Sequence, residues 1–182
     1  MRRITQVAVL GAVAFAFMYF DFPIPPFPAF LKYDPSEVPA LIATFALGPG
    51  FGIAVEAVKA VLISMLRSGT VGGPFGIFMN FLAGVTLVGV AGAYYLIEHT
   101  KAGAIKSLVF GVLTMTGVMI VANIMLTPIF FGIARDQVIG LVLPALLPFN
   151  LLKGAISSLI TYYVYKRLRV YLYEWIGDRT AW

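Results

Sequence analysis

Long apolar runs, separated by short polar or glycine-rich stretches, dominate the pattern of hydrophobic and polar positions along this chain. They predict helices at about residues 4–20, 37–47, 51–66, 74–97 and 107–131, and a last helix that begins near Ile139 or after Pro148. Several of these runs approach the roughly 20 residues that a helix needs to cross a bilayer. The pattern predicts an all-α integral membrane protein whose six transmembrane helices form a compact bundle.

Composition agrees with a membrane protein. Hydrophobic residues make up 60% of the chain, charged residues 12%, and the mean hydropathy is +0.94, whereas a soluble domain carries about twice that charge. The 182 residues suffice for one transmembrane domain, residues 1–182. The absence of cysteine excludes disulfides and thiolate sites. The net charge of +5 would suggest a nucleic-acid partner in a soluble protein, but the placement of the basic residues explains it better, so we expect lipid around the chain and no nucleic acid.

That placement also predicts an orientation. Six crossings put both termini on one side of the membrane, and eight basic residues lie on that side against three on the other. The eight are Arg2, Arg3, Lys101, Lys106, Lys166, Arg167, Arg169 and Arg179, and the three are Lys32, Arg67 and Arg135. Because basic residues favour the cytoplasmic side, both termini are expected in the cytoplasm, with the protein in the cell membrane.

Two loops then face outward. Residues 21–35 contain five prolines and several aromatic residues, which forbids a helix over most of the loop and favours a segment folded over something, as a lid. Ser36 is expected to cap the helix that follows. Residues 67–74 are rich in glycine but lack the sequence of a phosphate-binding loop.

The first apolar run carries a stripe of small residues. Ala8, Ala12 and Ala16 repeat every four residues, so they share one face of a helix. Such a stripe lets another helix approach closely. It serves either packing inside the bundle or docking of a partner protein.

Polar residues interrupt the later apolar runs. They are Asn80, Asn123, Asn150 and Lys153, together with Glu56 and Lys59. Asn150 and Lys153 share a helix face, and no acid lies within a turn of the lysine to neutralise it. Amides and an ammonium suit the polar edge of a planar heterocycle, and phenylalanines suit its faces. The alternative is structural, since asparagines commonly tie membrane helices together and Glu56 can neutralise Lys59.

No catalytic constellation is present. The sequence has a single histidine, His99, in a loop, no pair of acids on one helix and no serine elbow. It also lacks a nucleotide-binding motif, so any ATP-driven work falls to a partner chain. We therefore expect neither an enzyme nor a metal site, but a small binder or carrier in the membrane.

Several motifs resemble a known family. They are Leu31 to Pro39 (LKYDPSEVP), Phe45 to Pro49, Glu56 to Lys59, Asn80-Phe81, Asn123 before Thr127-Pro128, and Asn150 to Gly154. This set is similar to the riboflavin-specific S component of energy-coupling-factor (ECF) vitamin transporters, over nearly the whole chain.

The resemblance implies a six-helix subunit that binds riboflavin in an outward-open pocket gated by the first outward loop. It implies that Asn123, Asn150 and Lys153 contact the vitamin, and the predicted ligand-binding set is completed by Asn80, Glu56, Lys59 and Tyr33. The stripe Ala8, Ala12 and Ala16 would dock on the energising module, a transmembrane coupling protein with two ATPases. Riboflavin is then the transported substrate, and no cofactor is expected. The alternatives are an S component for another vitamin, such as thiamin or biotin, and a membrane scaffold without a small ligand.

Overall fold

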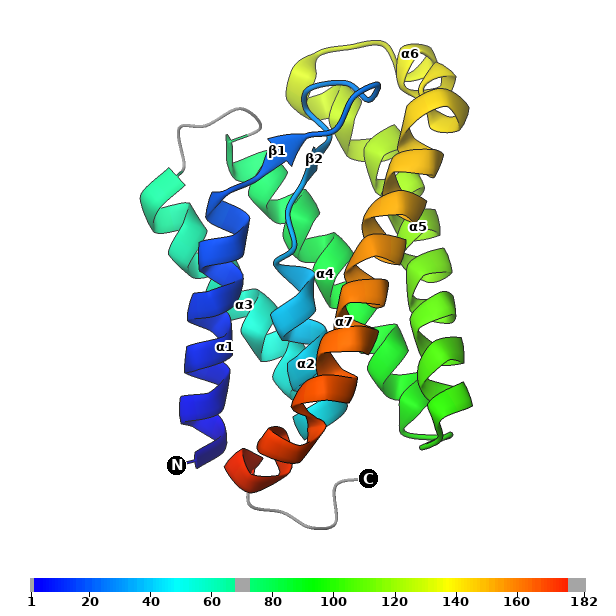
Figure 1. The fold of residues 1–182 in the computed structure, drawn as a ribbon. Helices are drawn as coiled ribbons and strands as arrows, with labels where there is room; N and C mark the ends of the chain where they lie inside the picture. The colour runs from blue at the N-terminus through cyan, green and yellow to red at the C-terminus, as the bar shows by residue number, and fades with distance from the viewer. Residues whose placement is uncertain (1, 68–72, 177–182) are drawn as a thin grey trace.

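The computed structural model describes residues 2–67 and 73–176, and it is a bundle of helices lying roughly side by side (Figure 1). The helices are α1 (Arg2–Tyr19), α2 (Glu37–Leu47), α3 (Pro49–Arg67), α4 (Gly73–Tyr95), α5 (Lys101–Phe131), α6 (Arg135–Gly140) and α7 (Leu147–Ile176), with a π-helical turn, Val142–Leu146, before α7. Two short antiparallel strands, β1 (Phe22–Pro23) and β2 (Lys32–Tyr33), pair in the loop after α1. The start of α1 and the end of α7 lie at one end of the bundle, and the paired strands and α6 lie at the other.

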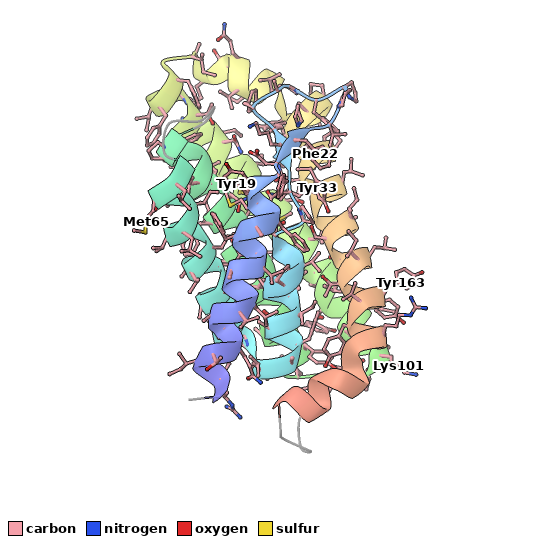
Figure 2. All side chains as sticks on the ribbon, turned by 60° about the vertical axis from the view of Figure 1, so that its left-hand side comes forward. Tyr19, Phe22, Tyr33, Met65, Lys101 and Tyr163 are labelled. Atoms are coloured by element: carbon pink, nitrogen blue, oxygen red, sulfur yellow. The ribbon has the colours of Figure 1, made fainter. Side chains whose placement is uncertain are left out.

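The helical membrane architecture is as predicted. Four segments are long and apolar enough to cross a bilayer: Pro49–Leu66, Gly73–Tyr95, Lys101–Phe131 and Val142–Tyr165. The helices α1 and α2 are apolar but shorter, so the count of six crossings stays a prediction. Large apolar side chains cover much of the outside, and Met65 and Tyr163 point away from the bundle in Figure 2. Exposed apolar side chains of this number suit contact with lipid.

Several predicted boundaries were wrong. Residues 101–106 belong to α5 rather than to a loop, because the side chain of Thr100 accepts a hydrogen bond from the Gly103 backbone N–H and so caps an earlier start. Residues 135–137, predicted as a connection, begin α6. The predicted end of this helix, at residue 131, is confirmed, since α5 continues through Pro128 to Phe131. Of the glycine-rich loop, residues 68–72 lie outside the described residues.

Ser36 also differs from its predicted role. It makes no side-chain capping bond to α2. Its hydroxyl instead donates to the carboxylate of Asp34 and accepts from the ammonium of Lys59. The serine thus joins a polar network inside the bundle rather than a helix end.

The helix α2 is the centre of the fold. Residues 37–46 are all buried, and α2 contacts α1, α3, α4 and α7. A helix that is enclosed on all sides has no solvent-facing side, which explains why its sequence after Glu37 is apolar except for Thr44, whose hydroxyl donates to the Ala40 carbonyl. Because α2 begins about halfway down the bundle (Figure 1), the chain must descend from β2 into the interior and carries Asp34 and Glu37 there.

Candidate ligand-binding site

A cavity of about 140 Å³ lies at the end of the bundle that carries the paired strands. Its wall combines the loop after α1 with side chains from α1, α3, α4, α5 and α7. The polar lining residues are Asp21, Lys32, Asp34, Asn80, Asn123, Asn150 and Lys153, and the apolar ones include Met18, Phe30, Phe75, Met79, Met119 and Phe149. The cavity is therefore mostly apolar with a few convergent polar groups, as small-molecule sites are.

Two asparagines on neighbouring helices form one polar part of the wall. The Nδ2 of Asn123 donates to the carbonyl of Met119 at 2.8 Å, and the Nδ2 of Asn150 donates to the carbonyl of Leu146 at 2.7 Å. Each bond joins a side chain to the carbonyl four residues earlier in the chain and uses one of the amide's two N–H donors. Both amides are thus held in a fixed orientation beside the cavity.

A buried group of charges forms the other polar part. The ammonium of Lys153 lies 3.1 Å from Asp34 Oδ2 and 2.8 Å from Glu37 Oε1. Asn80 donates from Nδ2 to the same Asp34 oxygen at 2.9 Å. No acid lies within a turn of Lys153 on its own helix, as noted from the sequence, but two acids pair with it from elsewhere, Asp34 from the descending loop and Glu37 from α2. Asp34 therefore joins α4 and α7 through two residues that line the cavity.

Glu56 and Lys59 lie outside the cavity lining. They are fully buried and form an ion pair at 2.5 Å within α3. Lys59 also donates to Ser36 Oγ at 2.9 Å, and Ser36 contacts Asp34. The pair is thereby linked to the cavity through Ser36 and Asp34, without facing it.

The loop residues of this network have altered acidities. Burial alone would raise the pKa of Asp34, but the nearby ammonium groups of Lys153 and Lys59 outweigh it and hold the pKa below its ordinary value. Asp34 is therefore a carboxylate at neutral pH and an acceptor for both Lys153 and Asn80. Burial raises the pKa of the Tyr33 phenol, which keeps that side chain neutral. The Tyr33 ring lies against Phe22, 5.7 Å between centroids, and outside the cavity lining (Figure 2).

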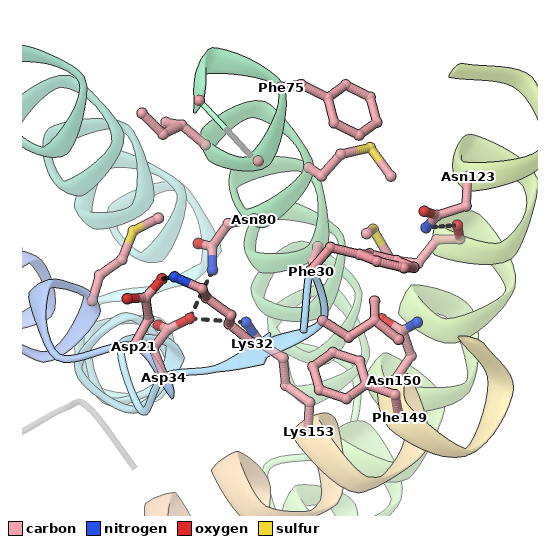
Figure 3. A pocket seen from close by; sticks show the side chains of 18 of the residues that line it. Asp21, Phe30, Lys32, Asp34, Phe75, Asn80, Asn123, Phe149, Asn150 and Lys153 are labelled. Atoms are coloured by element: carbon pink, nitrogen blue, oxygen red, sulfur yellow. Dashed lines mark hydrogen bonds and ion pairs between the residues drawn. The ribbon is translucent and has the colours of Figure 1, made fainter. Parts of the chain in front are cut away.

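Aromatic side chains lie between the two polar parts. Figure 3 shows the ring of Phe30 between the charged group on one side and Asn123 and Asn150 on the other, with Phe75 and Phe149 nearby. Phe149 is buried, whereas Phe30, which belongs to the loop, is 46% exposed. A flat apolar molecule placed here would have aromatic neighbours for its faces and fixed amides at its edge.

The sequence matches the family model of the "ECF transporter, substrate-specific component" over residues 2–165. The chain belongs to this family of S components. It is accordingly a multi-pass membrane protein of a transport system.

Curated relatives and a solved structure agree with this assignment. The S component is 33% identical over 177 residues to "Riboflavin transporter RibU" of Staphylococcus aureus, covering 94% of this chain and 92% of the relative. It is 30% identical over 179 residues to "Riboflavin transporter FmnP" of Bacillus subtilis, covering 94% of each chain. A solved structure, described as "Structure and mechanism of the S component of a bacterial ECF transporter", superposes with a TM-score of 0.82 at 34% identity, over 93% of this chain and 96% of the other.

The predicted ligand-binding residues divide into two groups in the S component. Asn80, Asn123, Asn150 and Lys153 come together around the cavity. Glu56, Lys59 and Tyr33 are buried but do not line it. The structure adds Asp21, Lys32 and Asp34 from the loop, which the sequence analysis did not select. The signal available for Asp34 was its position in the motif LKYDPSEVP, immediately before the buried helix α2.

The small-residue stripe of the S component lies on the outside of the bundle. Ala8, Ala12 and Ala16 are exposed, whereas Gly11 on the same helix is buried against Val58 of α3. Of the two roles considered for the stripe, packing inside this bundle is thus excluded for these three alanines.

Proposed function

We propose that this S component binds riboflavin in the cavity and takes it into the cell, with the work supplied by ATP hydrolysis on partner subunits. The observation that carries the proposal is the cavity itself: fixed amides at one end, buried charges at the other and aromatic rings between. Riboflavin has a flat apolar ring system, a uracil-like polar edge and a hydroxylated tail. The aromatic side chains of the cavity suit the ring, and its polar side chains suit the edge and the tail. The names of the curated relatives, both riboflavin transporters, support the same ligand.

In this proposal the amides of Asn123 and Asn150 bind the polar edge of the ring. The aromatic side chains of Phe30, Phe75 and Phe149 cover its faces. Lys153 and Asn80, oriented by Asp34, complete the polar wall. Riboflavin is the cargo of this subunit and not a cofactor.

The loop after α1 is the gate of the site. It supplies Phe30, Leu31 and Lys32 to the lining, and its lower end is anchored by Asp34 in the interior. Movement of the upper part, which carries the exposed ring of Phe30, opens the cavity towards the outside of the cell. The end of α7 and the start of α1 then lie in the cytoplasm, as the distribution of basic residues favours.

The exposed alanine stripe of α1 is the proposed docking surface for the energising module. Small side chains let a partner helix approach closely within a membrane, where packing is the main source of helix association. The partners are a transmembrane coupling protein and two ATPases, since this sequence has no nucleotide-binding motif of its own.

The experiment that tests the ligand uses the protein purified in detergent. We expect flavin absorbance in the purified protein, and saturable quenching of riboflavin fluorescence after the bound flavin is removed. Thiamin and biotin, titrated in the same way as competitors, should leave the riboflavin signal unchanged. Displacement by either vitamin would favour the other S-component specificities, and no rise in melting temperature with any of the three would favour a scaffold without a small ligand.

A further inference from the structure

The buried ion pair of α3 is a polar feature that does not face the cavity. Glu56 and Lys59 are fully buried and lie in the middle of the apolar segment Pro49–Leu66. Charged side chains are costly at such a depth in a membrane, and replacing a buried ion pair with uncharged side chains of similar size is often neutral or stabilising. Stability alone is therefore a weak reason for this pair, and the other contacts of the lysine indicate a second role.

Lys59 contacts the descending loop as well as its own helix. Its ammonium donates to Ser36 Oγ at 2.9 Å, and the Ser36 hydroxyl donates to Asp34 Oδ1. The backbone N–H of Ser36 donates to the same oxygen at 3.1 Å. A serine hydroxyl has one proton, so an oxygen that accepts from the ammonium is free to direct that proton at the carboxylate. Lys59 thereby holds one oxygen of Asp34 through a fully buried serine.

The second oxygen of Asp34 holds two residues of the cavity wall. Asp34 Oδ2 accepts from Asn80 Nδ2 at 2.9 Å and from Lys153 Nζ at 3.1 Å (Figure 3). A carboxylate whose two oxygens are bonded to different elements cannot rotate without breaking one set of bonds. The orientation of the wall therefore depends on the bonds at both oxygens, including the one that leads to Lys59.

We propose that Lys59 is a positioning residue for riboflavin binding, which acts on the cavity wall through Ser36 and Asp34. It keeps the Asp34 carboxylate ionised and fixes its orientation, so that the carboxylate in turn orients Asn80 and Lys153. This inference rests on the proposed function. Lys59 does not line the cavity, so its effect on binding is exerted without contact with the ligand.

The first test compares two variants that differ only in the ammonium group, Glu56→Gln and Glu56→Gln/Lys59→Met. In this background the loss of the lysine leaves no buried carboxylate of α3 unpaired, so the protein should fold. Fluorescence titration of the purified, flavin-free protein should show about tenfold weaker riboflavin binding in the double variant than in the single one. The melting temperature should not fall between the two. A pair with a purely structural role would not separate affinity from stability in this way.

Ser36→Ala interrupts the same link while both charges of α3 remain. It should weaken riboflavin binding by about three- to tenfold. In the Glu56→Gln/Lys59→Met background it should have a smaller effect, because the link that it breaks is already lost. The matched control is Ser107→Ala, at a fully buried serine of α5 whose hydroxyl donates to the Ala104 carbonyl at 2.8 Å, outside the cavity lining. This control should keep the wild-type affinity.

The pH dependence of binding provides a third readout. Burial would raise the pKa of Asp34, but the ammonium groups of Lys153 and Lys59 hold it below its ordinary value. Without the ammonium of Lys59 this pKa should rise. The affinity of Glu56→Gln/Lys59→Met should therefore decline more steeply than that of Glu56→Gln as the pH is lowered from about 8 to about 5.5. The charged and titratable groups around Asp34 are Lys59 and Glu56 of α3, Glu37 of α2, Tyr33 of β2 and Lys153 of α7.

The outcomes distinguish this inference from the proposed function. If the wild type binds no riboflavin, the proposed function fails and the inference fails with it. If riboflavin binds but the double variant binds it as tightly as Glu56→Gln, or Ser36→Ala keeps the wild-type affinity, only the inference is overturned. A joint fall of affinity and melting temperature in the double variant, or equal pH dependence in the two variants, would overturn it as well.

Discussion

Asn150 and Thr161 make the same kind of bond on the same helix. Asn150 donates to Leu146 and Thr161 to Ser157, each at 2.7 Å and each to the carbonyl four residues earlier. Both side chains are buried, but only Asn150 lines the cavity. The two residues thus form a natural pair for separating binding from stability.

We expect Asn150→Ala to weaken riboflavin binding by about 5- to 150-fold, because a lost buried hydrogen bond costs about 1–3 kcal/mol. Thr161→Val removes a comparable bond and should lower the melting temperature without weakening binding. Fluorescence titration and thermal unfolding of both variants in detergent provide the measurements. Equal affinity loss in the two variants would mean that Asn150 acts through stability alone.

Residues of the site could be predicted from the sequence where a polar side chain interrupts an apolar helix. Asn80, Asn123, Asn150 and Lys153 stood out because amides and an ammonium interrupt apolar helices, and all four line the cavity. Asp34 did not stand out, because an acid in a proline-rich loop is usually solvated. Its partner Lys153 lies 119 positions away, and no local pattern reports a contact of that range.

At the scale of elements, close packing of α4 depends on glycines. A Cβ on Gly84 would overlap the carboxylate of Glu56, and one on Gly92 would lie 2.6 Å from Thr44 Cγ2. Gly89 of the same helix is different, since the nearest atom to its Cβ position would be Ile53 Cδ1 at 3.9 Å. The helices α2 and α3 thus approach α4 at the first two positions but not at the third.

Gly84→Ala should therefore destabilise the protein by roughly 1–3 kcal/mol, since the added methyl displaces a buried ion-paired side chain. Gly89→Ala has room and gains helix propensity, so its melting temperature should equal or exceed that of the wild type. Thermal unfolding in one detergent compares the two. A Gly84→Ala protein as stable as Gly89→Ala would contradict the packing described for α3 and α4.

The stripe on α1 gives a second prediction at this scale. Ala12→Leu adds bulk on the proposed docking surface and should reduce co-purification with the energising module and riboflavin uptake by cells, while riboflavin still binds the isolated subunit. Ala155→Leu makes the same change at an exposed position of α7 and should leave both assembly and uptake intact. Equal loss in both variants would remove the stripe as the docking surface.

For the helix α2, the sequence predicted the bounds but not the position in the bundle. Its approximate bounds followed from the apolar run between Glu37 and Gly48. Its position at the centre, enclosed by four helices, did not follow from the sequence. A short apolar run has the same pattern whether the helix lies in a protein core or in a membrane. The helix starts near Lys101 and Arg135 were missed because polar residues there resembled loops.

For the whole molecule, the orientation in the membrane can be measured cleanly because the chain has no cysteine. Ala29→Cys, in the loop beside the cavity, should react with a membrane-impermeant maleimide added to intact cells. Ala102→Cys, at the opposite end of the bundle and also at an exposed position, should react only after the membrane is opened. The reverse labelling pattern would place both termini outside and contradict the proposed direction of uptake.

The arrangement of the whole molecule was the least accessible to sequence reasoning. Apolar runs predicted a helical membrane bundle, and the polar residues predicted an interior site. The loop after α1 connects the two, because it descends into the bundle and places Asp34 beside Lys153. This contact depends on the tertiary structure, so the sequence pattern did not predict it. Because of this contact, Lys153 is neutralised by acids of the protein itself. It is part of the ordered wall of the cavity and not an isolated charge that only a ligand could neutralise.

The central claim is that one cavity, between α4, α5, α7 and the first outward loop, holds riboflavin. An experimental structure of the protein purified with saturating riboflavin tests it most directly. The ring should lie beside Phe30 and Phe149, with the Asn150 amide about 3 Å from its polar edge. A flavin bound elsewhere, or no flavin in this cavity at saturation, would contradict the account.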